Sequence, residues 1–104
     1  MELTNLESVP GKTIVKHLGL VQGSTVRAKH AWRDILAGLK NIVGGELKAY
    51  TELLNESRQE AIERMVAQAR AAGANAVLNV RFSTSNIASG AAEVMVYGTA
   101  VLVQ

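Results

Sequence analysis

A stripe of apolar and small side chains at helical spacing constrains the fold of this chain more than any other feature. The stripe predicts one long amphipathic helix over about Leu47 to Ala72, because its members recur every three or four residues. It consists of Tyr50, Leu54, Ser57, Ala61, Met65 and Ala69, with Leu53, Ile62 and Val66 beside them. Gly73 suits the left-handed residue that ends many helices, and Arg70 lies in the last turn, where the helix dipole favours a cation. We therefore expect a helix that buries one face and ends just before Gly73.

The opposite side of this helix is charged. It carries Glu52, Glu56, Glu60, Glu63, Arg64 and Arg70. Glu60 precedes Arg64 by four residues, the favourable orientation for a surface ion pair. The glutamates share one side of the helix, where they could hold a hard cation such as Ca²⁺ or Mg²⁺. A solvated helix face is the favoured interpretation.

A shorter helix is predicted before the long one, over His30 to Val43. Its apolar residues at helical spacing are Trp32, Ile35, Leu36, Leu39 and Val43. Gly38 interrupts them at a cost of about 1 kcal/mol relative to alanine. Gly44 and Gly45 then allow the chain to turn into the long helix. They could also offer amides to an anion, but the phosphate-loop lysine and hydroxyl are absent, so we favour a hinge.

The residues before the helices predict a long β-strand over Thr13 to Ala28. The strand is bent at Gly19 or Gly23, or a turn at Gly23 and Ser24 splits it into a hairpin. We expect one face to carry Ile14, Leu18 and Leu20 and the other to carry Val15, His17 and Val21.

The residues after Gly73 predict a second β-hairpin. Ala76 to Thr84 forms its first strand, with Leu78, Val80 and Phe82 on one apolar face. Ser85 to Ala91 is expected to be a loop, and Glu93 to Val103 a strand that is apolar on both faces. The two strands should pair antiparallel.

These elements predict an α+β fold in a single domain over residues 1–104: a small antiparallel β-sheet packed on one long α-helix, with a preceding short helix. One helix cannot cover both faces of a sheet. The first and last strands are nevertheless apolar on both faces, which is typical of strands covered on both sides. We therefore expect a homo-oligomer whose subunits cover each other.

Composition excludes several classes of protein. The sequence has 104 residues and no cysteine, so disulfides and thiolate metal sites are excluded. No apolar run approaches the length of a membrane span, and the first residues lack the pattern of a signal peptide. We expect a cytoplasmic protein that does not bind a membrane.

The net charge of +2 is small but uneven along the chain. Between Ser8 and Gly45 the only acidic residue is Asp34, and the basic ones are Lys12, Lys16, Arg27, Lys29, Arg33 and Lys40. A dipolar subunit, or subunits that meet basic face to acidic face, is the favoured interpretation. The alternative is a weak nucleic-acid binder that uses the basic N-terminal half. It is disfavoured because no basic run alternates with the aromatic residues on which bases stack.

Several blocks of sequence resemble the YbjQ-like family. They are Arg33-Asp34, Gly38, Ile42-Val43-Gly44-Gly45, Tyr50, Ala67 to Val77, and Tyr97-Gly98-Thr99-Ala100-Val101. The resemblance extends from about Thr13 to Val103. It implies a small bacterial or archaeal protein with a dodecin-like β-α-β-β core that assembles as a homopentamer. The activity of the family is not established, although its domain is often labelled as heavy-metal-binding.

The metal label fits the side chains of this chain poorly. Soft metals favour thiolate and imidazole ligands, and the only histidines, His17 and His30, are not at a recognisable ligand spacing. They are weak metal candidates, and an ordinary polar or partly packed histidine is favoured for each. Arg33, Asp34 and Tyr50 match the family pattern and are weak candidates for binding a ligand near a subunit interface. Structural roles are favoured for them.

The sequence therefore favours a non-catalytic oligomeric binding or assembly module of unestablished role, with a metal ion or a small ligand as the candidate for what it binds. No cofactor can be named. A small-ligand enzyme with its site between subunits is the alternative. It is disfavoured because there is no cysteine nucleophile and no motif that links a serine to a histidine and a carboxylate.

Overall fold

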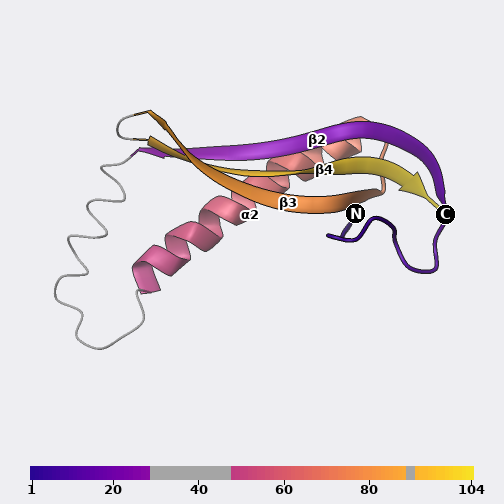
Figure 1. Ribbon diagram of the computed structural model, residues 1–104, viewed down its shortest axis with the longest axis horizontal. Coiled ribbons are helices and arrows are strands. Elements are labelled where there is room, and N and C mark those ends of the chain that lie inside the picture. Colours follow the sequence, from indigo (N-terminus) through magenta and orange to yellow (C-terminus); the bar gives the residue numbers. More distant parts are fainter. Residues whose placement is uncertain (29–47, 89–90) are drawn as a thin grey trace.

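The computed structural model describes residues 1–28, 48–88 and 91–104. Its elements are β1 (Glu2–Leu3), β2 (Ile14–Ala28), α2 (Lys48–Ala71), β3 (Ala76–Ala88) and β4 (Ala91–Val103). The strands form one sheet in the order β1-β3-β4-β2, which α2 crosses (Figure 1). The predicted α+β fold is confirmed. The predicted short helix at His30 to Val43 and the glycine hinge after it lie outside the described residues.

The long helix agrees closely with its prediction. It spans Lys48–Ala71 and buries Ser57, Ala61, Met65 and Ala69 along one stripe. Gly73 has a φ of 89°. The amide of Gly73 donates to the carbonyl of Arg70, and the amide of Ala74 donates to that of Ala69. Together these bonds make the Schellman cap, in which glycine takes the left-handed position without a steric penalty.

The sheet is mixed rather than wholly antiparallel. β4 pairs antiparallel with β2 on one side and with β3 on the other, while the two-residue β1 pairs parallel with β3. β2 runs unbroken through Gly23, so the alternative hairpin at Gly23 and Ser24 is wrong. β2 therefore forms one edge of the sheet along its whole length.

The predicted loop over Ser85 to Ala91 is also wrong. β3 continues to Ala88, with Ser85 opposite Glu93 and Asn86 opposite Ala92. The polar composition suggested a loop, but strand propensity depends on pairing and context more than on the side chain alone. Here the long partner strand β4 supplies the pairing, and Ser83, Thr84 and Ser85 are left exposed to solvent.

Two irregular residues invert the predicted faces of the strands. Gly19 has a φ of 97°, and the register between β2 and β4 shifts between His17 and Gly19. Leu18 packs toward α2, whereas Leu20 is 71% exposed and Ile14 packs against a different group of buried residues, across an earlier register shift between Ile14 and Lys16. The expectation that these three residues share a face is therefore wrong. An extra residue in one strand of a pair reverses the alternation beyond it.

The same reversal occurs in β3 at Asn79, whose φ is 53° and which lies within a register shift between Leu78 and Arg81. Val80 packs against the cluster under α2, while Leu78 belongs to a second cluster. The prediction of one apolar face for Leu78, Val80 and Phe82 is therefore wrong.

Two clusters of buried side chains result. The helix cluster lies between α2 and the sheet and consists of Val21, Ala61, Met65, Ala69, Val77, Val96 and Ala100. The end cluster consists of Val9, Ala76, Leu78, Val101 and Val103, with Ile14 packed against it. Val9 brings the N-terminal segment over that end of the sheet.

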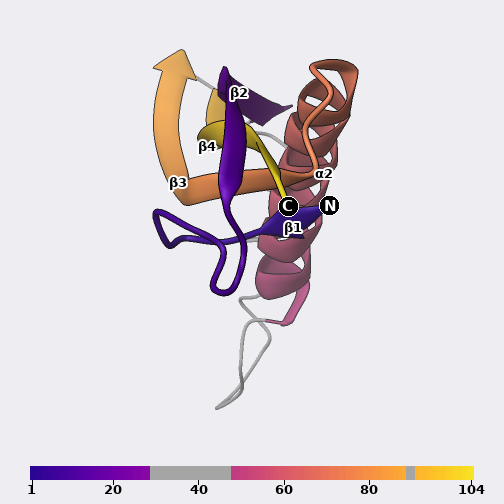
Figure 2. The ribbon, with the colours of Figure 1, turned by 90° about the vertical axis from the view of Figure 1, so that its right-hand side faces the viewer.

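The subunit is thin and long. It measures 53 × 29 × 17 Å, and its Cα radius of gyration is 16.9 Å. A compact domain of this length would have a radius of gyration of about 13 Å. Figure 2 shows α2 standing on one side of β2 and β4. Within the described residues, α2 lacks the run of apolar sequence that a membrane-crossing helix requires.

Candidate functional site

The face of the sheet turned away from α2 carries apolar side chains along its middle. We call Leu20, Val26, Met95 and Tyr97 the open face. The register places them together, because Leu20 lies opposite Thr99, Gln22 opposite Tyr97 and Ser24 opposite Met95. Their neighbours along the strands, Val21 and Val96, point the other way and are buried under α2.

The open face is accessible to solvent in the single subunit. Leu20 is 71% exposed and Val26 51% exposed, while Met95 and Tyr97 are half-buried. The end cluster covers the sheet only near Val101 and Val103. Polar residues such as Gln22, Ser24 and Thr99 lie between these apolar side chains. Exposed apolar side chains gathered on one face are typical of a surface that binds another macromolecule or a second copy of the chain.

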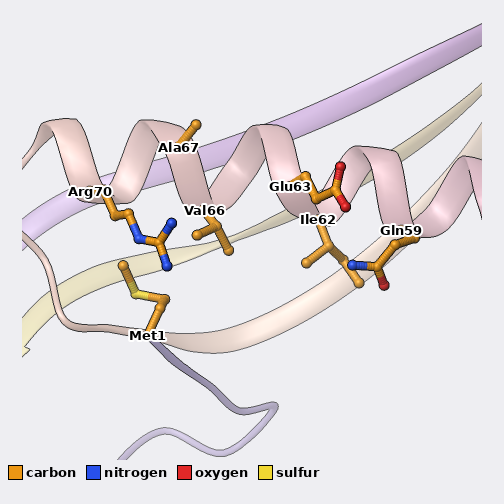
Figure 3. A pocket seen from close by; sticks show the side chains of 7 residues that line it. All are labelled: Met1, Gln59, Ile62, Glu63, Val66, Ala67 and Arg70. Atoms are coloured by element: carbon orange, nitrogen blue, oxygen red, sulfur yellow. The ribbon is translucent and has the colours of Figure 1, made fainter.

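A second concave surface lies along the flank of α2. It is a groove of about 340 Å³ lined by Met1, Gln59, Ile62, Glu63, Val66, Ala67 and Arg70. Figure 3 shows the side chain of Met1 pointing toward α2 near Val66 and Arg70. Ile62 and Val66 are half-buried, and Gln59, Glu63 and Arg70 place polar groups around them. The groove combines a small apolar floor with charges of both signs, which suits a protein segment.

Phe82 adds to the exposed apolar surface on the helix side of the sheet. It lies opposite Val96 in the register and is 48% exposed. α2 packs on β2 and β4 and does not cover the outer part of β3 (Figure 2).

The predicted metal ligands do not come together in the described residues. His17 is exposed on β2, opposite Val101, and His30 lies outside the described residues. Across residues 1–28, 48–88 and 91–104, no three histidine, cysteine, aspartate or glutamate side chains are grouped as metal ligands would be.

The predicted ligand-binding residues are only partly described. Arg33 and Asp34 lie outside the described residues. Tyr50 lies in the first turn of α2, and its side chain is outside the described part of the chain. The structure therefore does not test whether these three residues meet.

The charged side of α2 contains an ion pair between Glu60 and Arg64. The predicted pair is confirmed, with 2.8 Å between Nη2 of Arg64 and Oε1 of Glu60. Glu52 and Glu56 are exposed. This arrangement agrees with a largely solvated face rather than a cation site.

The basic N-terminal half is likewise only partly visible. Lys12 pairs with Glu2 at 3.5 Å, and Lys16 is exposed. Lys29, Arg33 and Lys40 lie outside the described residues. Binding of nucleic acid through this half stays a prediction.

Sequence reasoning missed three contacts of functional interest. Met1 lines the groove, Gln68 hydrogen-bonds to the edge of β2, and Arg64 does the same one turn earlier. Arg64 and Gln68 follow Glu60 at intervals of four residues, so their common helix face was visible in the sequence. Their partners on β2 were not, because they depend on how the helix crosses the sheet.

Comparison with known proteins gives one consistent family. The family model with the description "YbjQ_1: Putative heavy-metal-binding" matches residues 1–104. A UPF0145 protein of the bacterium Hahella chejuensis is 69% identical over 104 residues, which are 100% of each chain. A UPF0145 protein of the archaeon Archaeoglobus fulgidus is 57% identical over 99 residues, which are 95% of this chain and 92% of that protein.

One solved structure resembles the fold. It is a crystal structure of a protein of unknown function, assigned to the DUF74 family, from Pediococcus pentosaceus. Its TM-score is 0.64 at 17% identity, and the match covers 100% of this chain and 98% of that chain. At that identity the likeness concerns the fold alone.

Proposed function

This chain belongs to the YbjQ_1 family, and we propose from that premise that it is a non-catalytic binding or assembly module that works as a homo-oligomer. The observation that carries the proposal is the open face, where Leu20 is 71% exposed in the single subunit. Burial of a leucine side chain stabilises a structure by roughly 1.5–3 kcal/mol. This stabilisation is gained only when another surface covers the open face.

The residues of the open face suit a protein partner. Tyr97 and Met95 are of the types enriched at protein interfaces, and charged residues are few at the centre of such interfaces. The strands β2 and β4 are long, so the open face can meet another copy over a large surface. A second copy of the chain is the partner we propose. The homopentamer implied by the resemblance to the YbjQ-like family leads us to propose five copies, and we expect the assembly in the cytoplasm.

The heavy-metal description of the family fits the side chains of this chain poorly. Soft metals prefer thiolate and imidazole, and the sequence has no cysteine and two histidines. A single chain offers His17 on an exposed strand, and its described residues contain no group of three or more potential ligands. A metal site would need ligands from several copies, such as His17 repeated around an assembly.

Light scattering tests the assembly. At micromolar concentration the protein should have a mass that is a multiple of the 11.1 kDa chain. Leu20→Asp places a charge on the open face, at its most exposed residue, and should shift the mass toward the single chain. Phe82→Asp is the matched control, since Phe82 is 48% exposed and lies opposite Val96, on the helix side of the sheet. A soluble single chain in the unaltered protein would refute the proposal.

A further inference from the structure

β2 presents unpaired backbone groups along one edge of the sheet. It is the last strand in the order β1-β3-β4-β2, so among the described strands only β4 pairs with it. In an antiparallel pair, alternate residues of an edge strand point their amide and carbonyl toward the partner, and the others point them outward. An exposed edge of this kind is a template for another strand.

Two side chains of α2 form hydrogen bonds with outward-pointing backbone groups at the middle of this edge. The amide of Gln22 donates to Oε1 of Gln68 at 2.7 Å, and Nη1 of Arg64 donates to the carbonyl oxygen of Ser24. Gln22 and Ser24 are two residues apart, so both point their backbone groups to the same edge. One donor and one acceptor of β2 are thereby satisfied from within the subunit.

Glu60 completes this arrangement. Its Oε1 accepts a hydrogen bond from Nη2 of Arg64 at 2.8 Å, while Nη1 of the same guanidinium reaches Ser24. We call Glu60, Arg64 and Gln68 the capping row, because they follow one another at four-residue intervals on one side of α2. Arginine suits the middle position, since its planar fork donates in two fixed directions.

Gly23 allows α2 to lie close enough for these contacts. A Cβ atom at Gly23 would clash with the carbonyl oxygen of Ala61 and lie 2.5 Å from the amide nitrogen of Met65. The backbone of α2 therefore passes directly against β2 between Gln22 and Ser24. At that distance the side chains of Arg64 and Gln68 reach around the strand to its outer edge.

We infer that the capping row closes the middle of the β2 edge to strand addition by a second copy of this chain or by another extended segment. An incoming strand would have to displace both hydrogen bonds and separate Arg64 from Ser24. The closure of the edge is independent of the proposed oligomer. Its consequence, that a second copy covers the open face instead of extending the sheet at this point, rests on the proposed function.

Amide hydrogen exchange tests the cap at one position. Gln68→Ala should accelerate exchange of the Gln22 amide roughly tenfold, because that amide loses its acceptor. Gln68→Glu is the matched control, since its carboxylate still accepts, and it should keep the amide slow. The amides of Val21 and Gly23, which face β4, should keep their rates in both variants. An unchanged Gln22 rate in Gln68→Ala would overturn the inference, because another group would then protect that amide.

The unaltered protein gives a second readout that does not require a variant to fold. Its Gln22 amide should exchange more slowly than an unstructured amide, and a rate equal to the unstructured one would also overturn the cap.

Light scattering tests the closure itself. The double variant Arg64→Ala with Gln68→Ala should form species heavier than the unaltered protein at equal concentration, while Arg64→Lys with Gln68→Glu should not. The double alanine variant could have the same mass as the unaltered protein even though its Gln22 amide exchanges fast. That result would show that the capping row does not block strand addition. If the unaltered protein is a single chain, the proposed assembly fails, and the Gln22 rates still decide the cap.

Discussion

The two faces of the sheet are formed by the same strands, but their apolar side chains differ in burial. On the helix face, Val96 and Met65 are fully buried. On the open face, Leu20 and Val26 of β2 are more than half exposed. Polar residues such as Gln22 and Ser24 lie between Leu20 and Val26 on the open face, but hydrophobicity alone does not explain why this leucine and this valine are exposed. The difference is that the chain supplies α2 for one face, and the described residues supply only the N-terminal segment, at one end, for the other.

This contrast explains why one subunit is thin. A sheet and a single helix make two layers, and the shortest dimension of the subunit is 17 Å. A domain normally buries each apolar face against another layer. The described residues supply no third layer over the middle of the open face, and this is the reason for which we propose assembly.

The largest effect is expected on the helix face. Met65 has no exposed surface, so Met65→Ala should cost about 2–5 kcal/mol of stability through lost burial and the cavity left behind. Chemical denaturation at one fixed protein concentration measures this cost, because the stability of an oligomer depends on concentration. Glu52→Ala, on the exposed side of the same helix, should change stability by less than about 0.5 kcal/mol. Equal costs for the two variants would mean that the helix faces are assigned wrongly.

A smaller loss is expected where the helix meets the sheet. Gly23→Ala places a Cβ against the backbone of α2 at Ala61 and Met65. Overpacking of this kind costs about 1–3 kcal/mol. Because the helix must move away, the Gln22 amide should also exchange faster, as it loses Gln68. Gln22→Ala, which keeps the backbone amide and changes only an exposed side chain, serves as the control. A stable Gly23→Ala protein with a slow Gln22 amide would contradict the close approach.

The smallest effect in a dilute sample is expected on the open face. Leu20→Ala removes a side chain that a single subunit leaves exposed, so its cost should be within about 0.5 kcal/mol when the protein is diluted to single chains. The cost should grow as concentration rises and subunits cover the face. Denaturation curves at several concentrations measure the trend. A stability cost that does not change with protein concentration would show that the open face is not a surface through which the chains assemble.

The sequence predicted the parts of the fold that depend on local pattern. The helical stripe located α2 to within a residue at each end, and Gly73 identified its left-handed cap. The faces of the strands failed at two residues. Gly19 and Asn79 each adopt a positive φ at a place where the register shifts by one residue. A glycine or an asparagine in a strand does not by itself predict such a shift.

The candidate site was less accessible to sequence reasoning. The apolar residues of β2 and β4 correctly indicated a sheet that one helix cannot cover. Which of them form the open face depended on the shift at Gly19, which turned Leu20 outward. The contacts of Arg64 and Gln68 with β2 join residues 40 or more apart in the sequence. Such contacts follow from the angle at which the helix crosses the sheet, and no local pattern encodes that angle.

A native mass spectrum of the unaltered protein tests the proposed assembly most directly, since it retains subunit contacts and any bound ligand. We predict one dominant species at five times the 11.1 kDa chain mass, plus the mass of whatever the assembly holds. A dominant species at the mass of one chain, from a sample that is folded and soluble at micromolar concentration, would contradict the proposal that a second copy covers the open face.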